Sequence, residues 1–203
     1  NLVVNLGEIT CGNWGKINTQ AIARKVVEDI GYDDPSEGFS HDTFNYLCAI
    51  HGQSEDINRG VDRGAAEDQG AGDQGMMFGY ASNATLRFMP APIVFAHDLL
   101  EELTRLRREK VIGYLRPDSK AQVSVLHDNG KPVEITTVVI SHQTRDVPPD
   151  RIEKDLNAVA HEVLGKTGLL TSRTEFFINP TGKFVIGGPS GDSGVTGRKI
   201  IVD

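Results

Sequence analysis

Residues that could do chemistry gather in a glycine-rich run at residues 187–199. Glycine recurs through this run between two expected strands, Asp192 lies among the glycines, and the run ends in Arg198 and Lys199. Glycines let backbone amides approach an anion closely, and guanidinium and ammonium groups bind phosphate oxygens. The run is typical of an anion-binding loop, although a flexible hairpin loop with a basic end would have the same composition.

A second group of charges occupies residues 116–120, immediately before an expected strand. Its sequence, Arg-Pro-Asp-Ser-Lys, combines a rigid proline turn with one carboxylate, Asp118, and two cations, Arg116 and Lys120. A salt-bridged surface turn and a polar binding site are both compatible with this pattern.

A third segment, residues 52–75, has almost no large apolar side chains and includes residues 70–75, which match G-x-G-x-x-G. That fingerprint binds a dinucleotide only when a buried strand precedes it and a helix follows it. Neither is expected here, so a dinucleotide-dependent oxidoreductase is not supported. A long stretch without a core pattern predicts a lid, a binding loop or a surface linker.

Composition limits the partners of the chain. Its 203 residues carry a net charge of −7, and an acidic chain has no general surface for a nucleic-acid backbone. No apolar run approaches the roughly 20 residues that cross a bilayer. Cys11 and Cys48 give neither a disulfide framework nor a metal-ligand spacing, which is typical of reduced thiols. We therefore expect a cytoplasmic protein that binds neither nucleic acid nor membrane.

Apolar periodicity and turn signals predict strands and helices in a definite order. Strands are expected at residues 3–10, 44–50 (buried), 122–126, 133–140, 176–179, 184–186 and 199–202. Helices are expected at residues 20–30 and 93–110, and a third helix is expected to follow Asp150 and to end near Gly165. Turns at residues 128–130 and 180–182 predict two hairpins. Paired strands between helices predict an α+β fold with mixed or antiparallel sheets that helices cover on one face.

The ends and the buried faces of the helices also have sequence signals. Thr19 is expected to cap the first helix and Gly31 to end it, Pro92 to begin the second, and Asp150 to cap the third. The apolar stripe of the second helix is expected to consist of Ile93, Ala96, Leu100, Leu103 and Leu106.

Taken together, these segments resemble S-adenosylmethionine synthetase (methionine adenosyltransferase). The matching stretches follow the family's order along the whole chain, at residues 7–10, 53–57, 60–63, 69–78, 90–92, 116–120, 176–181 and 184–203. The two glycine-rich motifs, residues 70–75 and 187–199, are signatures of this family. The resemblance implies repeated α+β units of the S-adenosylmethionine synthetase type.

The resemblance also implies a reaction. The sulfur of methionine attacks C5′ of ATP and expels the triphosphate, which is hydrolysed to pyrophosphate and phosphate. The implied cofactors are Mg²⁺ and K⁺, and the implied substrates are ATP and L-methionine. The implied assembly is a homodimer or a dimer of dimers with active sites at the interface. A non-catalytic nucleotide-binding or regulatory protein of the same fold is the alternative.

Site residues are implied at the positions that match the family's motifs. Methionine binding is implied for Glu8, Gln53, Asp73 and Asp192, and a gating loop at residues 53–63 for Gln53, Ile57 and Arg63. ATP binding is implied for Asp118, Ser119, Lys120, Lys183, Phe184, Asp192, Arg198 and Lys199. Catalysis is implied for Lys120, Arg198 and Lys199, because cations oppose the charge that develops on a departing triphosphate.

Parts of the family pattern are missing from this chain. No His-Pro pair occurs, so the family's His-Pro-Asp motif is absent, and so is the acidic K⁺ ligand expected upstream of Glu8. We therefore expect the metal ligands to lie outside the chain. We interpret the chain as the middle half of a longer enzyme and expect it to be inactive by itself. The expected domains are the end of an N-terminal domain (residues 1–55), a central domain (68–186) and the start of a C-terminal domain (187–203).

Overall fold

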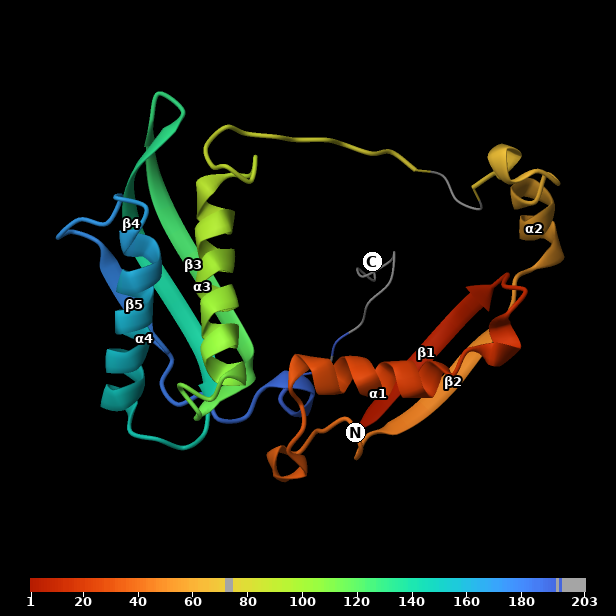
Figure 1. The fold of residues 1–203 in the computed structure, drawn as a ribbon, viewed down its shortest axis with the longest axis horizontal. Helices are drawn as coiled ribbons and strands as arrows, with labels where there is room; N and C mark the ends of the chain where they lie inside the picture. Colours follow the sequence, from red (N-terminus) through yellow and green to blue (C-terminus); the bar gives the residue numbers. More distant parts are fainter. Residues whose placement is uncertain (72–74, 193, 195–203) are drawn as a thin grey trace. The chain divides into compact units, whose positions relative to one another are not determined.

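The computed structural model describes residues 1–71, 75–192 and 194, and the chain divides into two compact units, Asn1–Gly79 and Tyr80–Asp203. Each unit has its own sheet and its own helices (Figure 1). One sheet is parallel and the other is mixed, so the predicted α+β class is confirmed. The expected domain boundaries stay predictions.

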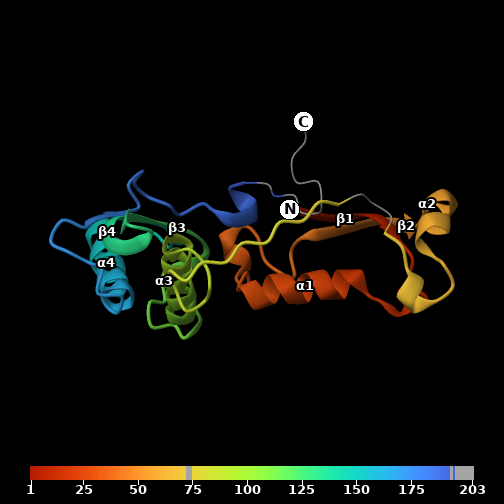
Figure 2. The same ribbon diagram turned by 90° about the horizontal axis from the view of Figure 1, so that it is seen from above.

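The first unit is built on two parallel strands, β1 (Leu2–Ile9) and β2 (Asn45–Gly52). Helix α1 (Thr19–Ile30) joins them and lies along one face of the pair (Figure 2). A crossover of this kind is what a parallel pair requires, because a tight turn cannot return the chain to the same end of the sheet. Short helix α2 (Glu55–Val61) follows β2.

Helix α1 begins one residue earlier than its sequence predicted. The cap is Asn18, whose side chain accepts a hydrogen bond from the Ala21 N–H at 2.9 Å, so the prediction that Thr19 caps the helix was wrong. Asparagine is at least as good a cap as threonine, which explains the shift. Gly31 ends the helix in the left-handed region at φ 107°, as predicted.

The second strand is not buried, contrary to the prediction from its apolar run. Phe44, just before β2, is enclosed by Phe39 and Arg24, but Leu47 within β2 is exposed. Helix α1 covers one face of the two-stranded sheet, and the apolar side chains of the other face remain exposed.

The second unit is a three-stranded sheet with helices on one face. Strands β3 (Leu115–Asp128) and β4 (Lys131–Thr144) are antiparallel, and β5 (Glu175–Ile178) pairs in parallel with β4. Helices α3 (Ala91–Arg108) and α4 (Pro149–Gly165) both lie against one face of this sheet (Figures 1 and 2).

The core of the second unit lies between that face and the helices. Its members are buried side chains from all these elements, among them Leu99, Leu103, Val138, Ile140, Leu156 and Leu164. Val123 faces Val138 across the hairpin, so the alternate residues of β3 and β4 point to the opposite, helix-free face. We call that side the open face.

The first predicted hairpin is confirmed, and its strands are longer than expected. Asn129 and Gly130 both have positive φ, 48° and 76°, which suits a tight hairpin turn. Residues 116–120 lie inside β3 rather than before it. The second predicted hairpin does not form, because residues 184–186 are not a strand; the chain instead lies against the end of β4.

Helix details in the second unit also differ from prediction. Pro92 lies in the first turn of α3, as expected, but Ile93 is exposed and the buried stripe includes Val94, Phe95 and Leu99. Pro148 precedes α4, whose first turn contains Asp150, so Asp150 is not the cap.

None of the helices in the described ranges combines the length and apolar composition that crossing a bilayer requires.

Candidate functional site

A pocket of about 420 Å³ in the first unit contains two of the predicted methionine-binding residues, Glu8 and Gln53. The other residues that line it are Ile9, Thr10, Asn58, Val61, Asp62 and Gln69. Carboxylate and amide groups therefore dominate its wall, which suits a ligand with an ammonium group and other hydrogen-bond donors.

Parallel pairing of β1 and β2 brings Glu8 and Gln53 together. Glu8 lies opposite His51 in the register, and the Gln53 N–H donates to the Ile9 carbonyl at 3.2 Å, just beyond the paired strands. Side chains at the same ends of parallel strands meet at one edge of the sheet. The Thr10 hydroxyl donates to Gln53 Oε1 at 2.9 Å, and the Ser54 N–H donates to the Glu8 carboxylate at 3.4 Å.

The segment predicted as a gating loop is partly helical. Residues 55–61 form α2, so the expectation of a stretch without regular structure was wrong there. Glu55 and Asp56 in its first turn complement the helix dipole. The segment then folds back, with the Gly70 N–H donating to the Val61 carbonyl at 2.8 Å. That residues 53–63, including Ile57 and Arg63, act as a gate stays a prediction.

A second set of predicted residues lies on the open face of the other sheet. The Asp118 carboxylate in β3 accepts a hydrogen bond from the Gly188 N–H at 2.9 Å. The Thr144 N–H at the end of β4 donates to the Phe184 carbonyl at 2.9 Å. The segment 184–188, which we call the anchored loop, is therefore held by side-chain and backbone bonds to both strands.

Gly187 lies in a tight space between the anchored loop and the sheet. A Cβ at this position would lie 2.7 Å from Cε2 of Phe184, 2.9 Å from Asp118 Oδ2 and 3.0 Å from Cδ of Gln143. Its φ of −158° is ordinary extended backbone, so glycine is required here by space and not by conformation.

The register of the hairpin separates Ser119 from Lys120. Ser119 pairs with the buried His142 and lies on the helix-covered side, whereas Lys120 pairs with Ser141 and is exposed on the open face. Lys120 therefore lies on the same face of the sheet as the anchored loop. Ser119 lies on the opposite side, so these two predicted ATP-binding residues are not brought together.

The remaining predicted residues are exposed or lie outside the described residues. The Lys183 ammonium group pairs with Asp146 at 2.7 Å, with both side chains more than half exposed. Asp192 is also exposed, and its N–H donates to the Gly188 carbonyl at 3.0 Å. Asp73, Arg198, Lys199 and the expected strand at residues 199–202 lie outside the described residues.

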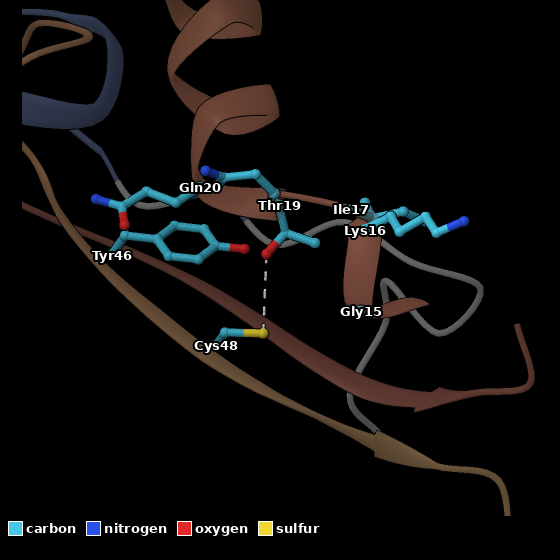
Figure 3. Close-up of a pocket in the computed structure, with 8 residues that line it drawn as sticks. Gly15, Lys16, Ile17, Thr19, Gln20, Tyr46 and Cys48 are labelled. Carbon is cyan, nitrogen blue, oxygen red and sulfur yellow. Dashed lines mark hydrogen bonds between the residues drawn. The ribbon is translucent and has the colours of Figure 1, made fainter. Parts of the chain in front are cut away.

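A pocket of about 490 Å³ at the start of α1 contains none of the predicted site residues. Figure 3 shows the Thr19 hydroxyl directed at Cys48 Sγ, 4.0 Å away, with Tyr46 beside them and Lys16 pointing away. This pocket is open and has no convergent charged groups, so the stronger candidates are two separate sites, the pocket with Glu8 and Gln53 in the first unit and the anchored loop in the second.

Sequence reasoning missed Gln143, which supports the anchored loop. The residue is 6% exposed, and its Nε2 donates to the Val185 carbonyl at 2.9 Å. Nothing in the local pattern of β4 singles it out. The glycine-rich motif did indicate close backbone approach in this region, but not which side chains Gly187 approaches.

His142, beside Gln143, is a buried group with a perturbed pKa. Burial lowers its pKa, and Arg107 acts in the same direction, whereas a hydrogen bond with the Gln143 carbonyl and the charge of Asp118 oppose the shift. The Asn179 side chain holds the backbone of His142 on both sides, at 2.8 Å to its N–H and 3.2 Å to its carbonyl. The imidazole is therefore held neutral within the sheet.

We expect His142 to make the stability of the protein depend on pH. The unfolded chain takes up a proton on this residue as the pH falls below about 6.5, and the folded chain resists protonation to lower pH. The contribution of the neutral His142 side chain to the free energy of unfolding is thus fully present above about pH 6.5 and is lost as the pH falls.

The midpoint of thermal unfolding, measured from pH 7.5 to 5, should depend less on pH in His142→Gln than in the wild type. The exposed control His127→Gln should keep the wild-type slope; equal slopes in all three proteins would contradict the assignment.

The α+β architecture is consistent with what comparisons with known proteins show. The family model described as S-adenosylmethionine synthetase, central domain, matches residues 68–184, and the chain belongs to this family. The chain is 50% identical to the S-adenosylmethionine synthase of Treponema denticola over 208 residues, and 48% identical to that of Roseiflexus castenholzii over 216 residues. Each alignment covers 100% of this chain and 53% of the relative, so the chain spans about half the length of these curated relatives.

Proposed function

We propose that the protein synthesises S-adenosylmethionine from ATP and L-methionine. The observation that carries this proposal is the meeting of Glu8 and Gln53 in one pocket, in a chain that belongs to the S-adenosylmethionine synthetase family. Both residues were assigned to methionine from sequence motifs alone. The two residues are more than forty positions apart in the sequence, so only the fold brings them into one pocket. Their shared pocket therefore supports the assignment.

The proposed reaction needs no general base. A lone pair of the methionine sulfur forms a bond to C5′ of ATP, while the C5′–O bond breaks and its electrons leave with the triphosphate. The sulfur becomes a sulfonium, and no proton is transferred in this step. Water then cleaves the triphosphate to pyrophosphate and phosphate. Such a reaction is accelerated by alignment of the reacting atoms and by exclusion of water.

We assign the residues of this chain to complementary tasks. The Glu8 carboxylate pairs with the ammonium group of methionine, and Gln53 adds a hydrogen bond. The Phe184 ring stacks on the adenine base, and Asp118 holds the anchored loop that contains the ring. The cations of Lys120, Arg198 and Lys199 oppose the negative charge on the triphosphate as it departs.

The proposal includes Mg²⁺ and K⁺, which the family resemblance implies. Within residues 1–71, 75–192 and 194, no group of three or more His, Cys, Asp or Glu side chains could hold a metal ion. The described residues therefore do not fit such an ion by themselves. We propose that its ligands lie in parts of the protein beyond this sequence.

The proposed assembly is a homodimer or a dimer of dimers, with active sites at the interface, in the cytoplasm. Reduced thiols support the location, since Cys11 and Cys48 are both free and exposed. Apolar side chains on the uncovered face of β1 and β2, including Leu2, Leu6 and Leu47, support an interface, because exposed apolar patches commonly mark contact surfaces.

The proposal is tested by product analysis of the full-length protein. With ATP, L-methionine, Mg²⁺ and K⁺, we expect S-adenosylmethionine, pyrophosphate and phosphate in equal amounts. Absence of all three products overturns the catalytic proposal. Binding of ATP without turnover would instead favour the alternative, a regulatory protein of the same fold.

Glu8→Gln is expected to raise the KM for methionine about tenfold, because a charge-assisted hydrogen bond to the substrate's ammonium group becomes a neutral one. The KM for ATP should change little. Initial rates at varied methionine concentrations measure the effect. Glu28→Gln, an exposed change on α1, is the matched control and should behave as the wild type. An unchanged methionine KM in Glu8→Gln would refute the assigned role.

A further inference from the structure

Gln143 joins the end of β4 to the anchored loop by a specific hydrogen bond. Its Nε2 donates to the Val185 carbonyl at 2.9 Å, while the N–H of the next residue, Thr144, donates to the Phe184 carbonyl at 2.9 Å. Two successive residues of the strand therefore hold two successive residues of the loop. Only the first of these bonds depends on the identity of a side chain.

The other end of the same carboxamide has no partner. Gln143 Oε1 is buried and accepts no hydrogen bond from any residue in the described part of the chain. Turning the amide over would place this oxygen against the Val185 carbonyl, so that two acceptors would face one another; the bond to Val185 therefore fixes the orientation. A buried acceptor without a partner lowers the stability of a fold. Stability of the sheet alone thus does not account for a glutamine here.

Gly187 lies against this carboxamide and against the Phe184 ring. The Cβ that Gly187 lacks would lie 3.0 Å from Gln143 Cδ and 2.7 Å from Cε2 of Phe184. A shift of the carboxamide therefore acts on the backbone of the loop at Val185 and Gly187, and Phe184 belongs to the same loop. Asp118 holds the far end of the loop through the Gly188 N–H, so the loop cannot relax freely from that side.

We propose that Gln143 is a positioning residue for the nucleotide. It holds the Val185 carbonyl and so sets the place of the Phe184 ring for stacking on the base. The inference rests on the proposed function, because it takes this ring as the base-binding surface. Retention of an unpartnered buried acceptor is explained by the need for the N–H donor at the other end of the same side chain.

The test is Gln143→Met in the full-length protein, because methionine keeps the length of the side chain and removes both hydrogen-bonding groups. We expect the thermal unfolding midpoint to stay the same or rise, since the unpartnered acceptor is gone. The Kd of ATP, measured by calorimetry, and its KM should rise about tenfold, as loss of one hydrogen bond would give. The KM of methionine and the kcat at saturating ATP should stay within about twofold.

Two further variants sharpen the result. Gln143→Glu keeps the length of the side chain but has no N–H for Val185, so it should weaken ATP binding at least as much as Gln143→Met. Gln122→Met makes the same chemical change at an exposed position of β3 and should leave both the midpoint and the ATP affinity unchanged.

An unchanged ATP affinity in Gln143→Met would overturn the inference. A lower midpoint, with kcat and both KM values impaired together, would also overturn it, because that pattern indicates a purely structural role. A wild-type protein that neither binds ATP nor forms product would overturn the proposed function itself, and the inference with it. That failure is seen before any variant is compared, so the two failures are distinguishable.

Discussion

Lys120→Ala is expected to reduce kcat about 10²–10³-fold at saturating ATP and methionine, which is the usual effect of removing one group that stabilises charge in a transition state. Lys120 is exposed on the open face of the β3–β4 hairpin, on the same side of the sheet as the anchored loop. Its ammonium group is proposed to oppose the charge that forms on the triphosphate as the C5′–O bond breaks. The effect should therefore appear in kcat more than in either KM.

Folding should be almost unaffected by this change, since substitutions of exposed side chains rarely alter stability by more than about 0.5 kcal/mol. Lys131→Ala, at the exposed other end of the hairpin, is the matched control and should retain wild-type turnover. Steady-state kinetics and thermal unfolding of both variants separate the two roles. Equal losses of turnover and stability in Lys120→Ala would argue against a part in catalysis.

Gly187→Ala is expected to raise the KM for ATP between about 10-fold and about 100-fold, from an overpacking penalty of about 1–3 kcal/mol at the anchored loop. The added methyl group would lie 2.7–3.0 Å from Phe184, Asp118 and Gln143, which is closer than such contacts allow. Because the backbone of Gly187 is extended, alanine can adopt it, and the effect is purely steric. One or more of these three side chains, or the loop itself, must therefore shift, and each of these shifts alters the place of the Phe184 ring or the contacts that hold the loop.

Gly165→Ala provides the control for a glycine substitution in the same unit. Gly165 is the last residue of α4, and a Cβ there meets nothing within 4 Å. Alanine should therefore leave ATP kinetics unchanged and stabilise the fold slightly, because glycine is the poorer helix former. If Gly187→Ala binds ATP as tightly as Gly165→Ala does, the anchored loop does not form part of the nucleotide site.

Elements that rest on local signals could be predicted from the sequence. The left-handed end of α1 at Gly31 and the hairpin turn at Asn129 and Gly130 follow from residues that tolerate positive φ. The predictions were wrong where contacts between distant segments of the chain determine the secondary structure. Residues 116–120 belong to β3 because Leu115, Ser119 and Lys120 pair with the end of β4 on either side of an irregularity. Residues 184–186 do not form a strand because they are held as a loop against Gln143 and Thr144.

The family of this protein and the positions of its chemistry-bearing residues follow from motif order and residue type, which are properties of the chain alone. Which of those residues meet depends instead on the three-dimensional fold. Parallel pairing of β1 and β2 brings Glu8 and Gln53 to one edge, and the hairpin register places Lys120, not Ser119, on the face with the anchored loop. These outcomes depend on strand direction and register, which are set by packing between distant segments, so no local pattern of residues could specify them.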